Sequence, residues 1–379
     1  MLALLLIVVR AGIVWAWPHF CADVGSYFQA ALWWEKGHWL YAAGPNGCPC
    51  TPLQQPLPSF ALWVSNQLWL TWFQSDRAVI YGAVVRSACI VYDLLTFAGL
   101  VKLGVPSRML LWGWVLNPVS LLLTGIHGNM IGHSLALTVL ALAWREYWAM
   151  SALSLGVAIG LGMWPVLLAP VLAWRVKVLR YLTIAALPTL FSMLWYVYST
   201  HEATLMLTNM LARKWVHDVG WMAAAREAWY LWSGRYSLPE TIPEEWMPRA
   251  QAAFLIAYTA MLVAALRWRH PRGLAWPVLL FLVVAAGGAS EFIILPLPFL
   301  LLSDNWREYT IAGFFGALAP LLLYHTGMTL TPWLHDCLYP LNEPHRNAVA
   351  ALCFAATMSC WVVCARTLLR EVMWQERPS

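Results

Sequence analysis

Charged residues are scarce in this chain of 379 residues. Asp, Glu, Lys and Arg together make up 11% of it, whereas soluble domains carry roughly 25%. Hydrophobic residues account for 61%, and the mean hydropathy is +0.62. This scarcity of charge excludes an ordinary water-soluble domain. The composition predicts an all-α integral membrane protein that lies in a lipid bilayer.

Short motifs of several protein classes are also missing. The chain has no Gly-x-x-x-x-Gly-Lys loop, no dinucleotide-binding glycine pattern and no His-Glu-x-x-His motif. Nucleotide-driven transport and membrane metalloproteolysis therefore lose support, and we expect neither a metal nor another cofactor. The net charge of +5 suits an anionic membrane surface and requires no nucleic acid.

Long hydrophobic runs dominate what is present. A membrane-crossing helix needs about 20 apolar residues, and we expect about twelve such helices, in a range of roughly 10 to 13. Arg10 lies within the first run and no basic residue precedes it, so we expect a retained helix rather than a cleaved signal peptide. The hydrophobic segments are 1–17, 57–73, 79–101, 109–124, 130–144, 151–174, 181–199, 251–268, 274–289, 291–302, 309–325 and 347–369.

Two long polar segments, 18–56 and 200–250, interrupt these runs, and we expect juxtamembrane helices in both. If the N-terminus is cytoplasmic, strict alternation of the helices puts both segments on the extracytoplasmic face. Basic residues favour this orientation on balance, since most of them fall inside: Arg77, Arg175, Lys177, Arg180, Arg267, Arg269, Arg272, Arg307, Arg366, Arg370 and Arg377. Lys102 and Arg145 fall outside as local exceptions, as do Arg108 and Arg346.

The first polar segment carries Asp23 just after a hydrophobic run. An isolated charge at a membrane boundary is solvated, paired or functional, and no neighbour in the sequence pairs with it. It is either a chemical group or a residue at the start of a juxtamembrane helix, where Asp is favoured. Tyr27 and Tyr41 are among several aromatic residues nearby that suit contact with a sugar or with the membrane interface.

The second polar segment supplies cations between tryptophans. They either hold a phosphate group or bind lipid headgroups beside an interfacial aromatic belt. Residues 220–232 place tryptophans at helical intervals and predict an amphipathic helix at the interface. The cations are Arg213, Lys214, His217, Arg226 and Arg235.

Polar residues within the hydrophobic runs leave further alternatives. Arg86 and Asp93 share one helix face and either pair inside the protein or take part in chemistry. His127 and His133 flank a glycine-containing break and are candidates for contact with a lipid phosphate, although strict alternation puts this break on the cytoplasmic side. Glu291 either orients a substrate or ends a helix.

Seven of the eight cysteines fall into two groups, and Cys337 lies in a late outer loop. Cys21, Cys48 and Cys50 lie in the first polar segment, where a bridge from Cys21 to either of the others fits an oxidising face. Cysteines within the hydrophobic runs, such as Cys89 and Cys360, are expected to be buried as small apolar residues.

The order of the motifs resembles that of the GT-C glycosyltransferases, polytopic enzymes that take sugars from polyprenyl phosphates. A short helix precedes Asp23-x-x-x-Tyr27, then Gly37-x-x-x-Tyr41 and Thr51-Pro52-Leu53 follow, as in the first outer loop of that family. The later matches, to stretches of its mannosyltransferase and glucosyltransferase branches, are Asn117-Pro118, His127-Gly128-Asn129, Met163-Trp164-Pro165 and Ser290-Glu291 before Leu295-Pro296.

The resemblance implies a GT-C-like fold and an inverting hexosyltransferase. Asp23 would be the general base, and mannose is the favoured sugar. Tyr27, Tyr41, His127 and Glu291 would contact substrate, while Arg213, Lys214, His217 and Arg226 would hold the lipid phosphate. The donor would be a polyprenyl-phosphate sugar and the acceptor a glycolipid or glycan. No second acidic residue flanks Asp23, so the resemblance includes no metal pair.

The same resemblance suggests an organisation for the chain. A transmembrane module with the catalytic loop would cover 1–200, the second outer loop 200–250 and further transmembrane helices 251–379. The modest length and short termini favour a multi-pass protein of a prokaryotic plasma membrane over one of the endoplasmic reticulum. Two other functions stay open: a non-catalytic GT-C-like subunit or scaffold, and a lipid transporter or flippase.

Overall fold

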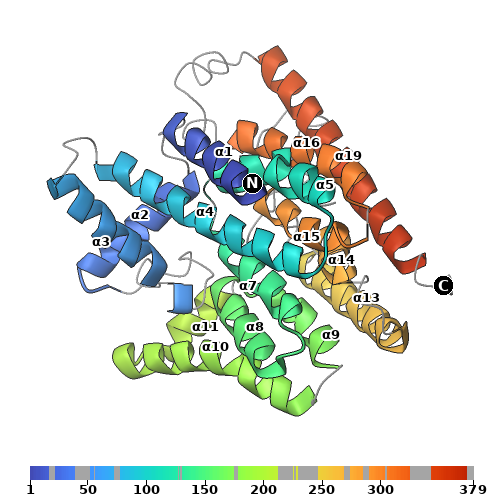
Figure 1. Cartoon of the computed structure of the whole chain (residues 1–379), viewed down its shortest axis with the longest axis horizontal. Coiled ribbons are helices and arrows are strands. Elements are labelled where there is room, and N and C mark those ends of the chain that lie inside the picture. Colours follow the sequence, from blue (N-terminus) through green and yellow to red (C-terminus); the bar gives the residue numbers. More distant parts are fainter. Residues whose placement is uncertain are drawn as a thin grey trace. The chain divides into compact units, whose positions relative to one another are not determined.

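Helices make up all the regular structure in the part of the chain that the computed structural model describes (Figure 1). This agrees with the predicted all-α class. The described residues are 1–16, 22–38, 52–54, 56–71, 77–126, 128, 130–174, 178–211, 225, 228, 246–268, 274–284, 290–303, 305–324 and 343–373.

The chain forms two compact units. Unit 1 comprises Met1–Gly104 and Leu123–Lys214, and unit 2 comprises Val105–Leu122 and Trp215–Ser379. The helices of unit 1 are α1 (Leu2–Ala16), α2 (Ala22–Glu35), η2 (Pro52–Gln54), α3 (Pro56–Thr71), α4 (Arg77–Lys102), the end of η4 (Leu121–Ile126), α7 (Ile131–Ala143), α8 (Trp148–Gly162), η5 (Trp164–Leu168), α9 (Ala169–Ala173), α10 (Val178–Thr200) and α11 (Ala203–Leu211).

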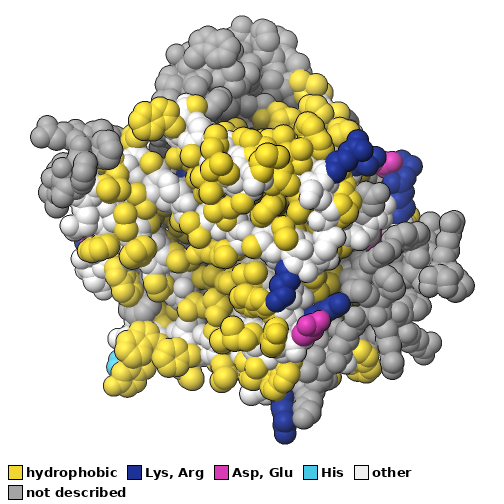
Figure 2. Space-filling model, viewed as in Figure 1, with side chains coloured by type: hydrophobic (Ala, Val, Ile, Leu, Met, Phe, Trp, Pro, Cys, Tyr) yellow, Lys and Arg dark blue, Asp and Glu magenta, His cyan; other side chains and the backbone are white. Residues whose placement is uncertain are grey.

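Three helical stretches among the described residues are long and apolar enough to cross a membrane: Arg77–Lys102, Ser107–Ile126 and Val178–Thr200. On α10, the residues that point outward are large and apolar, including Leu190, Phe191 and Leu194, whereas Ala185 is buried. Hydrophobic side chains cover most of the described surface in view (Figure 2). These features support a membrane protein, because such a surface is stable against lipid rather than water.

Helix α4 contacts several other segments of unit 1 in succession along its length (Figure 1). Its first residue, Arg77, donates hydrogen bonds to Glu35 of α2, at 3.0 Å, and to Asn66 of α3, at 2.7 Å. Its last residue, Lys102, lies 5.6 Å from the ring centre of Tyr147, between α7 and α8. We call these the Arg77 end and the Lys102 end of unit 1.

The direction of α3 differs from that expected of a membrane crossing. Glu35 and Asn66, near the C-terminal ends of α2 and α3, both contact Arg77, so both helices run toward the Arg77 end. Residues 57–71 of the predicted segment 57–73 are helical, but this helix does not return the chain to the Lys102 end. Strict alternation therefore fails here, and the helix ends between Lys102 and Arg145 change side relative to the prediction.

The helices α7, α8 and α10 pack through small residues and hydroxyl groups. Ser151 Oγ donates to the carbonyl oxygen of Ala141 at 2.6 Å and lies 2.9 Å from Tyr181 Oη. A Cβ atom at Gly156 would lie 3.0 Å from the Cα atom of Ala185, so α8 and α10 are too close for a larger residue. Internal bonding of this kind satisfies polar groups that lipid cannot.

Unit 2 is built around α16 and α19, which lie side by side (Figure 1). A Cβ atom at Gly316 would lie 2.8 Å from Cys360 Sγ, which shows how closely the two helices approach. The described helices of this unit are α5 (Ser107–Leu110), η3 (Leu111–Val115), α6 (Pro118–Ser120), α13 (Trp246–Trp268), α14 (Trp276–Val284), η8 (Ser290–Ile294), α15 (Leu297–Leu300), α16 (Trp306–Tyr324) and α19 (Glu343–Met373).

Glu371 lies buried in unit 2, beyond the apolar stretch 347–369 of α19. Its Oε1 atom accepts hydrogen bonds from Ser303 Oγ at 2.5 Å and from Asn305 Nδ2 at 2.7 Å. Burial raises the pKa of this carboxyl, although the two hydrogen bonds act in the opposite direction. The fold therefore favours the protonated form.

We expect the substitution Glu371→Gln to remove a pH-dependent loss of stability. A carboxyl whose pKa rises on folding stabilises the protein below its unfolded pKa of about 4.3, and this contribution is lost as the pH rises through the folded value. Glutamine keeps an acceptor for both donors without the charge. Melting temperatures measured from about pH 4 to 7 should fall less steeply for this variant than for the native protein.

Glu308→Gln is the matched control, because Glu308 pairs with Arg370 at the protein surface. It should leave the slope of melting temperature against pH unchanged. Equal slopes for the native protein and Glu371→Gln would contradict the assignment.

Candidate functional site

Asp23 is the second residue of α2, a helix within the first polar segment, where a helix was expected. Its side chain lies outside the described part of the structure. A carboxylate in a first helical turn interacts favourably with the helix dipole, so this position suits a helix-start role as well as a chemical one.

Tyr27, one turn further along α2, connects this helix to the break after η4. Its Oη atom accepts a hydrogen bond from the backbone N–H of Met130 at 3.4 Å. Val24, Tyr27 and Met130 belong to one hydrophobic cluster with residues of α3 and α4. The start of α2 is thereby packed onto the break at 128–130.

The break itself depends on Gly128, whose backbone has φ +69°. A Cβ atom at this position would lie 2.9 Å from Arg86 Cγ and 3.2 Å from Val24 Cγ2. Both the left-handed backbone and the close packing require glycine. Arg86 is buried at this junction of α2, α4 and the break. The break therefore lies beside α2 rather than at the opposite end of unit 1, as strict alternation predicted, because α3 does not return the chain to the Lys102 end.

The end of α8 reaches the same region. Met163, which leads into Trp164-Pro165, has φ 51°, a strained value for a residue with a side chain. Trp164 Nε1 donates to Ser134 Oγ in α7 at 2.7 Å. Leu53 of η2 fills the space beside Gly160, one turn before Met163.

Four segments that carry the motifs are thus linked by successive contacts away from the Lys102 end of unit 1: α2 packs on the break, α7 follows the break and contacts the end of α8, and the end of α8 contacts η2. They come from α2, η2, the break and the end of α8, although more than 100 residues of sequence separate the first from the last. We call this region the motif junction. Its described polar groups include Tyr27 Oη and the Arg86 guanidinium.

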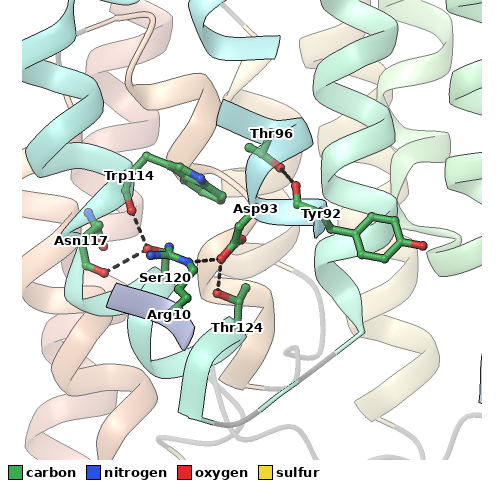
Figure 3. A network of polar contacts seen from close by, with 8 residues as sticks. All are labelled: Arg10, Tyr92, Asp93, Thr96, Trp114, Asn117, Ser120 and Thr124. Atoms are coloured by element: carbon green, nitrogen blue, oxygen red, sulfur yellow. Dashed lines mark hydrogen bonds and ion pairs between the residues drawn. The ribbon is translucent and has the colours of Figure 1, made fainter. Parts of the chain in front are cut away.

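A buried ion pair lies next to the motif junction (Figure 3). Arg10 Nε of α1 donates to Asp93 Oδ2 of α4, and Thr124 Oγ1 of η4 donates to the same oxygen at 2.7 Å. The side chains of Arg10 and Asp93 are 1% and 2% exposed. The sequence pattern indicated only Arg86 as a partner for Asp93. Arg10 could have been predicted to form an ion pair, because a charge inside an apolar run needs a partner.

His133 is buried in α7 and therefore lies inside unit 1 rather than on a lipid-facing surface. Its ring meets that of Tyr92 edge to face, with centroids 3.9 Å apart. This packing favours a structural role for the side chain.

The remaining two motifs come together within unit 2. Asn117 Oδ1 accepts from the N–H of Val119 at 2.9 Å and caps α6, while its Nδ2 donates to Thr310 Oγ1 at 2.9 Å. Tyr309 Oη donates to the carbonyl oxygen of Ile293 in η8 at 2.5 Å. Glu291 belongs to η8, and its side chain lies outside the described part. These bonds connect both motif segments to α16.

Most of the predicted phosphate-binding cations fall outside the described residues, so their roles stay predictions. Cys89, Cys360 and Cys364 are buried, in line with expectation. Outside the described residues lie Tyr41, His127, Arg213, Lys214, His217, Arg226, Arg235, Cys21, Cys48 and Cys50.

Comparison with known proteins gives no further assignment. No protein-family model and no curated protein matches this chain. Among the described residues, no group of three or more His, Cys, Asp or Glu is placed to hold a metal ion.

We expect Gly128→Ala to destabilise unit 1 by more than Gly104→Ala. Both glycines have positive φ, +69° and +81°, so both variants incur the left-handed backbone cost of roughly 1–2 kcal/mol. A Cβ atom at Gly104 meets nothing within 4 Å, whereas one at Gly128 meets Arg86 and Val24. Overpacking should add about 1–3 kcal/mol, measurable as a lower melting temperature in detergent. Equal losses for the two variants would show that the junction is loosely packed.

Proposed function

We propose that this protein is a membrane glycosyltransferase that moves a hexose, with mannose favoured, from a polyprenyl-phosphate donor to a glycolipid or glycan acceptor. The observation that carries the proposal is the motif junction. Four segments that match the GT-C pattern in sequence order also lie together in the fold, which unrelated matches would have no reason to do. A scaffold derived from the same family would keep this packing, so activity has to be measured.

The chemistry assigns one role to Asp23. An acceptor hydroxyl is a weak nucleophile, so the carboxylate takes its proton as the oxygen attacks the anomeric carbon. The bond between that carbon and the phosphate oxygen breaks, and the lipid phosphate leaves with the electron pair. A single base fits inversion, since retention requires a nucleophilic carboxylate as well.

The leaving phosphate requires positive charge near the anomeric carbon. Arg213, Lys214, His217 and Arg226 are the proposed clamp, with His127, Tyr27, Tyr41 and Glu291 as substrate contacts. Arg86 is a further candidate, because its guanidinium belongs to a buried side chain at the motif junction.

The proposed orientation puts the N-terminus and the Lys102 end in the cytoplasm. Lys102, Arg145 and Arg180 then lie on the cytoplasmic side, in agreement with the preference for basic residues there. At the opposite, extracytoplasmic end of α4, the charge of Arg77 is paired with that of Glu35. This orientation brings the motif junction toward the extracytoplasmic face.

Cysteine labelling of sealed, right-side-out membrane vesicles tests this orientation. In a variant without native cysteines, Lys36→Cys should react with a membrane-impermeant maleimide, whereas Arg145→Cys should react only after permeabilisation. Both positions are exposed in the structure. The reverse pattern would exclude an extracytoplasmic motif junction.

Sugar transfer from defined donors tests the activity. Purified protein in nanodiscs is incubated with radiolabelled polyprenyl phosphate mannose or glucose and a membrane lipid extract as acceptor. We expect transfer from one donor by the native protein and a loss of roughly 100-fold or more in Asp23→Asn, because general-base catalysis contributes about 10² to 10⁴.

Glu35→Gln is the control, since it removes a carboxylate from the other end of the same helix. It should transfer sugar at the native rate. Equal transfer by the native protein and Asp23→Asn would exclude Asp23 as the base, and no transfer from either donor would favour the scaffold function.

A further inference from the structure

We propose that Asp93 is a positioning residue, which acts through Arg10 and Thr124 to hold the break at 128–130 against α2. This inference rests on the proposed function for its catalytic consequence, but its structural content stands by itself. Figure 3 shows the three side chains converging from α1, α4 and η4. We call Arg10, Asp93 and Thr124 the ion-pair cluster.

Two donors from separate helices share one acceptor atom. Arg10 Nε and Thr124 Oγ1 both donate to Asp93 Oδ2, the latter at 2.7 Å. All three residues are at most 2% exposed, so water does not replace either bond. A buried charge without its partners is strongly unfavourable, and the three groups therefore hold α1, α4 and η4 in a single arrangement.

The arrangement extends directly to the break. Gly125 follows Thr124 and packs against Ile13 of α1, since a Cβ atom there would lie 3.4 Å from Ile13 Cγ2. Three residues later, Gly128 meets Arg86 and Val24. The position of Thr124 consequently determines where the chain emerges at the motif junction.

A second observation explains why a hydrogen bond is needed at this point. Thr124 lies in residues 121–126, which form a π-helix, a rare helical form that occurs mostly as short bulges and frequently at functional sites. The bond from Thr124 to Asp93 gives this irregular turn a directional contact with α4.

Thr124→Val tests the proposal because it removes the hydroxyl and keeps the shape. Thr96→Val is the matched control: Thr96 is also buried, lies one turn from Asp93 on α4, and bonds to the carbonyl oxygen of Tyr92 at 3.0 Å. Thr124→Ser restores the hydroxyl and should recover the native behaviour.

Hydrogen exchange gives a readout that does not depend on catalysis. The backbone N–H of Met130 bonds to Tyr27 Oη, so its exchange rate reports whether the break stays against α2. We expect this rate to rise roughly tenfold or more in Thr124→Val, as for the loss of a hydrogen bond to a charged group, and by less than about twofold in Thr96→Val. Equal rates in the two variants would overturn the proposal.

Steady-state kinetics then separate this inference from the proposed function. A displaced break should lower kcat at least several-fold with little change in KM, because positioning acts mainly on the transition state. Absence of transfer by the native protein would refute the proposed function, and hydrogen exchange would still decide the role of Asp93. Transfer by Thr124→Val at the native kcat, despite faster exchange, would overturn the catalytic part of this inference alone.

Discussion

The structure depends on one constraint: polar groups inside a lipid-embedded fold have to find their partners within the protein. The ion-pair cluster meets this constraint with charges, and Ser151, Ser134 and Asn117 meet it with neutral hydrogen bonds between helices. Each such bond has a defined length and direction, unlike apolar contact. Polar side chains therefore determine which helices meet and in which register, while apolar residues supply most of the buried area.

Helix α4 shows how this constraint shapes unit 1. From its first to its last residue, α4 contacts Glu35 of α2, Gly128 of the break, Arg10 of α1 and Tyr147 just before α8. These contacts determine where each of these segments lies along α4. Because α2 and α3 run alongside its first turns, they extend unit 1 at the Arg77 end rather than crossing it. The motif segments come together as a consequence, although they are distant in the sequence.

Helix positions were largely predictable from the sequence, and partners were not. The predicted segments 79–101 and 181–199 correspond to α4 and α10 within a few residues, because length and hydropathy determine them. The direction of α3 was not predictable, since a hydrophobic run has the same composition whether it crosses the fold or runs beside a neighbour. Because strict alternation assumes that every preceding helix crosses, the wrong direction for α3 also gave the wrong side for the break.

Side-chain partners were harder to predict because spacing within one helix says nothing of other helices. Arg86 and Asp93 share a face of α4, but seven residues correspond to about 10 Å along a helix. Asp93 instead meets Arg10, a residue 83 positions away. A charged residue within an apolar run thus indicates a partner on another helix. By the same reasoning, the role of Asp23 at the start of α2 depends on the residues of the motif junction rather than on its neighbours in the sequence.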